Sequence, residues 1–265
     1  VDGDTGYFGS YDGRVYAIEG VRSNDISEMW RFPTHGRVFG KLTVEDGSVY
    51  FGSEDNFLYS LSAETGERNW RVDTGGAIGG GYPKIVDGTV YVSSGYGGED
   101  IISGSDEFGK LLAVDGDTGD IKWTVRKGKG MQSPPVITNS TLYQGCRNNK
   151  FYAFDPKTGS ELWSFETGGP FCSSEPEVAA DTVYVGCEDN NMYALNSEDG
   201  SLVWEFETGG IIAGTPIATD EALYFGSNHG HLYAVHPDTG EGVWRVDAYV
   251  KVFSSPAHRD GAVYV

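Results

Sequence analysis

Apolar and polar residues alternate along this chain in short runs, and most runs end at Gly, Asn or Asp. Alternation with a period of two predicts half-buried β-strands separated by tight turns. One stretch of the chain contains four such runs, which are YPKIV from Tyr82, TVYVS from Thr89, LLAV from Leu111 and IKWTV from Ile121. They predict a meander of four antiparallel strands.

The same pattern recurs along the whole chain. Six tryptophans mark the copies, and four of the five gaps between them are 40 or 41 residues: Trp30, Trp70, Trp123, Trp163, Trp204 and Trp244. Pairs that tolerate a positive φ lie between the second and third strands (Asp12-Gly13, Asp55-Asn56, Asp189-Asn190, His229-Gly230) and between the third and fourth (Thr65-Gly66, Thr118-Gly119, Thr158-Gly159, Thr239-Gly240).

Four-stranded sheets at this period predict an all-β fold, a β-propeller with at least six blades in one domain over residues 1–265. Residues 6–10 are expected to be the second strand of one blade, and the run DGAVYV from Asp260 the second strand of another. Because that strand would occur twice in a closed six-bladed ring, we expect the chain to be a fragment of a longer one, with seven or eight blades.

The turn before the tryptophans carries a motif, A-x-D-x-x-T-G-x-x-x-W, from which some copies depart: Ser60 and Ser62 replace Ala and Asp, Asn196 and His236 replace Asp, and Asp199 replaces Thr. Ala113, Asp115, Thr118, Gly119 and Trp123 match it fully. This motif resembles the repeat of the pyrroloquinoline-quinone-like propeller family, and the resemblance covers nearly the whole chain. It implies that the tryptophans are structural and lie between neighbouring sheets. This family includes outer-membrane assembly lipoproteins and quinoprotein dehydrogenases.

The net charge is −20, from 39 acidic and 19 basic residues. This charge argues against nucleic acid or an anionic membrane surface as a partner. The acidic composition resembles that of proteins from salt-loving, haloarchaeal-type microbes, which have no outer membrane. No apolar run approaches the roughly 18 residues that span a bilayer, so we expect no membrane insertion. The family resemblance implies an extracytoplasmic or cell-surface location.

The chain has three cysteines, which cannot all pair with one another. Cys146 and Cys187 occupy the same repeat position, where other copies have a serine, and this favours a small buried residue. Cys172 lies in the first strand of the repeat that contains Cys187. The sequence leaves open whether Cys172 and Cys187 form a disulfide.

Strand polarity places two sets of loops at one edge of the blades: the turns between the second and third strands, and the loops from each fourth strand to the next blade. We call this edge the rim. Basic residues gather in its loops, namely Arg37, Lys127, Lys129 and Lys251, with Gln132 at the entrance to a first strand. They could bind a small polycarboxylate or a phosphate. Alternatively, they only relieve repulsion in an acidic chain.

The gap between Trp70 and Trp123 is 53 residues, which puts about 13 extra residues into a rim turn, roughly residues 95–109. Hard oxygen ligands for Ca²⁺ occur there, namely Glu99, Asp100, Asp106 and Glu107. A mobile, solvated Gly-rich hairpin is the alternative.

The leading functional hypothesis is a non-catalytic propeller, without a cofactor, that binds an exported or surface protein through its rim. The second is a quinoprotein dehydrogenase or its remnant, with pyrroloquinoline quinone (PQQ) and calcium. The resemblance implies an adjacent Cys-Cys pair in such enzymes, and this sequence has none. A ligand-sensing domain of a larger receptor is the third. Fold alone does not decide among them.

Overall fold

The computed structural model describes residues 2–23, 25–79, 82–95, 109–131, 133–138, 140–171, 174–259 and 261–265. The chain divides into two compact units, Val1–Pro135 and Val136–Val265. Across these described ranges the strands form seven separate sheets, every pairing is antiparallel, and no helix is long and apolar enough to cross a membrane. That residues 1–265 form a single domain stays a prediction.

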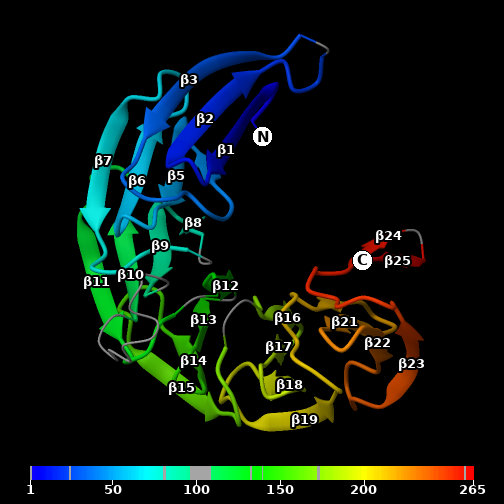
Figure 1. Ribbon diagram of the computed structural model, residues 1–265. Helices are drawn as coiled ribbons and strands as arrows, with labels where there is room; N and C mark the ends of the chain where they lie inside the picture. Colours follow the sequence, from blue (N-terminus) through cyan, green and yellow to red (C-terminus); the bar gives the residue numbers. More distant parts are fainter. Residues whose placement is uncertain are drawn as a thin grey trace. The chain divides into compact units, whose positions relative to one another are not determined.

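The first unit contains three sheets, which we call blades 1 to 3 (Figure 1). Blade 1 consists of β1 (Thr5–Ser10), β2 (Arg14–Glu19) and β3 (Ser27–Pro33). Blade 2 consists of β4 (Thr43–Glu45), β5 (Ser48–Gly52), β6 (Phe57–Ser62) and β7 (Arg68–Asp73). Blade 3 consists of β8 (Lys84–Val86), β9 (Thr89–Ser94), β10 (Lys110–Asp115) and β11 (Ile121–Arg126).

The second unit contains blades 4 to 7. Blade 4 consists of β12 (Val136–Thr138), β13 (Thr141–Cys146), β14 (Lys150–Phe154) and β15 (Glu161–Glu166). Blade 5 consists of β16 (Glu177–Ala179), β17 (Thr182–Gly186), β18 (Asn191–Asn196) and β19 (Leu202–Glu207). Blade 6 consists of β20 (Ile217–Ala218), β21 (Leu223–Ser227), β22 (His231–Val235) and β23 (Gly242–Asp247), and blade 7 of β24 (Ala257–Arg259) and β25 (Ala262–Tyr264).

Each complete blade is the predicted four-stranded meander, and blade 1 begins, as predicted, at a second strand. The first strands are shorter than the sequence pattern indicated. The run from Tyr82 gives only Lys84–Val86, since Pro83 has no N–H to donate to a ladder. Both predicted turn positions are confirmed, with φ of 75° at Asn56 between second and third strands and 79° at Gly119 between third and fourth.

The motif of the third strand and its turn has a clear physical basis. In blade 4, Ala153 pairs with Trp163 across the ladder, and the register shifts directly after this alanine. The Asp155 carboxylate then accepts hydrogen bonds from the backbone N–H of Lys157 and Thr158, at 2.7 and 3.1 Å. Such an Asx turn closes the loop that brings the chain back to the tryptophan.

A repeated clamp joins neighbouring blades within each unit. In blade 4, Tyr143 Oη and Trp163 Nε1 both donate to the carbonyl oxygen of Ser197 in the third-to-fourth turn of blade 5, at 3.3 and 3.1 Å. A side chain at Gly200, where φ is +72°, would meet the Trp163 ring at 2.5 Å. The tryptophan therefore needs glycine in the turn on which it lies.

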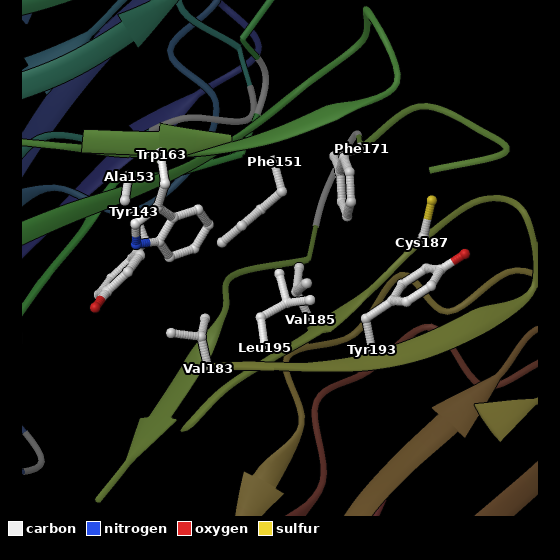
Figure 2. Packing of buried hydrophobic residues seen from close by; sticks show 10 residues of the cluster. All are labelled: Tyr143, Phe151, Ala153, Trp163, Phe171, Val183, Val185, Cys187, Tyr193 and Leu195. Atoms are coloured by element: carbon white, nitrogen blue, oxygen red, sulfur yellow. The ribbon is translucent and has the colours of Figure 1, made fainter. Parts of the chain in front are cut away.

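The same pair recurs at other joints. Tyr7 and Trp30 donate to Ala63, Tyr50 and Trp70 to Gly116, and Tyr184 and Trp204 to Pro237. Between the sheets, buried apolar residues fill the joint. Figure 2 shows Phe151 and Trp163 of blade 4 beside Val183 and Leu195 of blade 5. This packing is the core that holds the rim loops in place.

Candidate functional site

The rim loops are anchored by the turn between the second and third strands of the following blade. In blade 2, the Asp55 carboxylate accepts hydrogen bonds from Tyr59 Oη at 2.8 Å and from the backbone N–H of His35 at 3.0 Å. Asp189 does the same in blade 5 with Tyr193 and Gly168. Burial, and then the hydrogen bond to Asp55, raises the pKa of Tyr59 to about 12, so the phenol stays a donor.

An exposed group of aromatic and cationic side chains lies on the rim of the first unit, and we call it the Tyr11 cluster. It comprises Tyr11, in the turn between β1 and β2, with Arg37 and Phe39 from the loop after β3. The rings of Tyr11 and Phe39 lie 5.6 Å apart, and the Arg37 guanidinium lies 5.5 Å from the Tyr11 ring centre. The Tyr11 residue is 64% exposed. This cluster presents an open surface of the residue types that dominate protein interfaces.

Arg37 is therefore placed on the rim, as the sequence indicated, but it has neighbours that the sequence did not predict. Its Nε lies 3.9 Å from Glu54 Oε2, so part of its charge is offset by a carboxylate. Because the Arg37 side chain is well exposed, this pair stabilises the fold little. The arginine stays open to a partner above the Tyr11 ring.

The loop after β23 in the second unit has a matching composition, and we call residues 249–253 the Tyr249 loop. Lys251 and Phe253 occupy the repeat positions of Arg37 and Phe39, because Val252 lies against Gly226 as Val38 lies against Gly9. Tyr249, with φ of 62°, is 94% exposed, and Lys251 and Phe253 are also exposed. Two rim loops, one in each unit, thus present a cation and a phenylalanine in the same register.

The other predicted rim residues give a mixed result. Lys127 is half-buried and Lys129 exposed, in the loop that leaves β11, where the Gly128 carbonyl accepts a hydrogen bond from the Gly109 N–H. Gln132 and the acidic candidates Glu99, Asp100, Asp106 and Glu107 lie outside the described residues. Ligand binding at these positions stays a prediction.

The disulfide alternative is wrong. Cys187 is a buried free thiol, and Cys172 lies outside the described residues. The Cys187 Sγ lies 3.3 Å from the carbonyl oxygen of Gly169. At the equivalent position of blade 6, the Ser227 hydroxyl donates a hydrogen bond to the carbonyl oxygen of Gly210. Burial raises the pKa of the Cys187 thiol to about 11. The residue takes the small, buried place that the serines take in other blades.

The tryptophans differ in exposure. Trp30, Trp70, Trp163 and Trp204 are buried, with at most 9% exposed, and each lies on the turn of the next blade. Trp123 is half-buried and lies 6.0 Å from the Tyr91 ring. Trp244 is 38% exposed.

Among the described residues, no three His, Cys, Asp or Glu side chains converge in a way that could hold a metal ion. His229 and His231 stack 5.6 Å apart, and His231 Nε2 lies 2.9 Å from Asp247, which explains this histidine pair as packing in the blade. The whole sequence also has no adjacent cysteines.

Comparison with known proteins identifies the family. A family model described as outer membrane protein assembly factor BamB matches residues 1–123, 107–245 and 208–265. The chain belongs to this family. It is similar over 94% of its length to the crystal structure of BamB from Moraxella catarrhalis, of which it covers 74%, with a TM-score of 0.75 and 17% identity. The fold is therefore a β-propeller of the BamB type, as the sequence pattern predicted.

Two relatives of known function match parts of the chain. Tetrathionate hydrolase of Acidithiobacillus ferrooxidans is 26% identical over 149 residues, which are 51% of this chain and 30% of that protein. Quinoprotein alcohol dehydrogenase PedH of Pseudomonas putida is 31% identical over 131 residues, which are 48% of this chain and 21% of that enzyme. The matched segments thus span less than a third of these relatives.

Two sets of residues were not predicted from the sequence. The clamp tyrosines stand at one repeat position, with the sequence Tyr followed by an apolar residue and Gly in most blades, so the repeat itself was a sufficient signal. Lys41, Tyr82 and Lys84 also meet near the first strands of blades 2 and 3. Their signal is weaker, because the lysines occupy different repeat positions.

Proposed function

We propose that this propeller is a non-catalytic scaffold that binds an exported or cell-surface protein through its rim. The observation that supports this most directly is the shared cation and phenylalanine of the Tyr11 cluster and the Tyr249 loop. Exposed aromatic surface is costly to leave in water, and Tyr, Phe and Arg side chains are enriched at protein interfaces. The BamB relatives, named as assembly factors, support a role in binding proteins.

Charge suggests the chemistry of the partner. The chain carries −20 overall, yet both loops place a cation beside an exposed phenylalanine. A partner with an acidic and aromatic segment would complement them, since opposite potentials favour both specificity and encounter. The proposed location is outside the cytoplasm.

The test uses photo-crosslinking in the cells that produce the protein. A photoreactive amino acid replaces Tyr11 or Tyr249 in the full-length protein, and crosslinked partners are identified by mass spectrometry. We expect the same partner from both positions. The variant Arg37→Glu with Lys251→Glu should abolish its capture.

The matched control is Lys157→Glu, which reverses an exposed charge in the turn between β14 and β15, at the opposite edge of blade 4. This variant should retain the partner. Equal capture by the double variant and the parent would contradict a role for the rim.

A quinoprotein dehydrogenase is the second candidate, favoured by the similarity to PedH. Titration with PQQ and Ca²⁺ at a fixed molar salt concentration, followed by tryptophan fluorescence and melting temperature, decides between them. A ligand that binds only the native state raises its stability. A saturable rise in melting temperature would favour the dehydrogenase over the scaffold.

A further inference from the structure

One position of the repeat carries an acidic residue in every four-stranded blade except blade 3. It is the last residue of the fourth strand, which pairs across the ladder with the first residue of the third strand. The acidic residues are Asp73, Glu166, Glu207 and Asp247. In blade 3 the residue is Arg126, and it pairs with Lys110. Two cations therefore lie opposite each other where the other blades have an acid.

In blades 4 and 6 the acid contacts the basic side chain opposite it. Lys150 Nζ lies 3.7 Å from Glu166 Oε2, and His231 Nε2 lies 2.9 Å from Asp247 Oδ1. Among the described residues, no carboxylate forms an ion pair with Lys110 or Arg126. Directly opposite residues of an antiparallel ladder share one face of the sheet, and like charges there destabilise it. Blade 3 thus lacks the carboxylate that would neutralise this pair.

The neighbours of Lys110 do not replace that carboxylate. Ser94 pairs with Lys110 on its other side, and the buried Ser94 Oγ has no hydrogen-bond partner in the described part of the chain. The Lys110 ammonium lies against Gly75 in the loop after β7, where a side chain would collide with it. Asp73 Oδ1 accepts a hydrogen bond from the Gly75 N–H at 2.7 Å, so this loop holds the carboxylate for itself.

The two cations are accessible from the rim. The third strands begin and the fourth strands end at this edge, and Arg126 is exposed while Lys110 is half-buried. A guanidinium group can donate two parallel hydrogen bonds to one carboxylate, and an ammonium group adds a third charged donor. A carboxylate from outside the chain would therefore occupy the place that an acid of the chain takes in the other blades.

We propose that Lys110 and Arg126 form a binding site for a carboxylate ligand on the rim of blade 3. Two negative charges match the two cations, so the ligand is a small dicarboxylate or a protein segment with successive acidic side chains. The site uses neither the Tyr11 cluster nor the Tyr249 loop, and it does not depend on the protein-binding role.

Malonate is the first probe. Its binding to the purified protein is measured by calorimetry, with the ionic strength held constant by sodium chloride. We expect saturable binding with a dissociation constant on the order of 1 mM, since two exposed side chains supply the contacts. The Nε–H resonance of Arg126, followed by NMR in nitrogen-15-labelled protein, should shift with the same midpoint and so locate the ligand.

Substitutions test both cations. Arg126→Glu gives blade 3 the acid of the other blades and should weaken malonate binding at least about tenfold, because a charged donor is replaced by a like charge. Arg126→Lys keeps the charge but loses the paired donors, and Lys110→Met loses one cation, so each should weaken binding about threefold.

The matched control is Arg68→Glu, which makes the same change of charge at the opposite end of a fourth strand, in blade 2. It should leave malonate binding unchanged. The melting temperature of Arg126→Glu should be no lower than that of the parent, because an opposite-charge pair replaces a like-charge pair. Loss of binding by this variant is then not a loss of the fold.

A capped peptide of four glutamates is the second probe, titrated under the same conditions. A peptide affinity equal to or above that of malonate assigns the site to an acidic protein segment, and a lower one assigns it to a small dicarboxylate. Absence of binding of both probes to the parent, or binding that Arg126→Glu retains, would overturn the proposal.

Discussion

One first strand in each unit carries a charged residue at the same repeat position, and the two charges are opposite. Lys84 in blade 3 and Glu177 in blade 5 each pair with the tyrosine of the second strand, Tyr91 and Tyr184. Two residues earlier stand Tyr82 in blade 3 and Glu175 in blade 5. The ladder fixes the backbone at these positions, but it leaves the side chains free to differ.

The joints between blades show the opposite behaviour. The clamp of Tyr50 and Trp70 in the first unit and that of Tyr143 and Trp163 in the second use the same donors and the same kind of acceptor. The difference teaches that the repeat preserves packing between blades, while charge near the first strands varies from unit to unit. Binding chemistry is therefore best sought where the copies disagree.

The largest expected effect tests the Tyr–Trp clamp at the joints between blades, which both units share. Trp30→Ala in the first unit and Trp163→Ala in the second should each lower the free energy of unfolding by about 3–5 kcal/mol, because each leaves a cavity at a buried joint. Urea denaturation at fixed salt measures both. Trp244→Ala is the matched control, and since Trp244 is 38% exposed, its cost should be clearly smaller. Equal costs at all three positions would contradict the clamp as the source of stability.

The sequence predicted the strands, the turns and the tryptophans of the joints but not the clamp tyrosines, because the alternation, the turn pairs and the tryptophan period follow from rules that act within one copy. Asn56 and Gly119 could be assigned a positive φ from residue type alone. The contacts among Lys41, Tyr82 and Lys84 could not be predicted in this way. Lys41 and Tyr82 are 41 residues apart, and their contact depends on how two first strands are staggered. The Arg37 pair with Glu54 was missed because it joins a rim loop to a turn of the following blade.

The next effect concerns a repeat position where the blades differ in chemistry. Cys187 in blade 5 replaces the serine found at Ser53 in blade 2. Its folded pKa of about 11 lies above the ordinary thiol value of about 8.5. A raised pKa means that its contribution to stability is complete below about pH 8.5 and is lost as the pH rises through about 11.

We therefore expect the parent to lose on the order of 2 kcal/mol from this thiol between these pH values. Cys187→Ser should remain close to the parent at pH 7 and lack that part of the alkaline loss. Urea denaturation at pH 7 and pH 10.5 measures the difference. The tyrosines with raised pKa, such as Tyr59, titrate in both proteins, so they cancel. Parallel alkaline curves for the two proteins would contradict the buried thiol.

The smallest expected effect concerns Glu177 in the first strand of blade 5. Burial raises the pKa of Glu177, and a hydrogen bond from the Ala218 backbone only partly opposes this. The parent should lose stability as the pH rises from the ordinary glutamate value of about 4.3 through the raised one, since the charged form is disfavoured in the folded state. Glu177→Gln keeps an acceptor for the Ala218 N–H without the charge. At pH 7 the free energy of unfolding of this variant should be about 0.5 kcal/mol higher than that of the parent, and at pH 4 the two proteins should be equally stable.

Lys84→Met, at the equivalent position of the first unit, gives the matched measurement. Its pH profile between 4 and 7 should follow that of the parent, because this variant keeps Glu177. A glutamine variant whose profile also follows the parent would mean that Glu177 is well solvated. In that case the two units would differ in the sign of charge at this position but not in what that charge costs the fold, and opposite charge alone would distinguish the first strands.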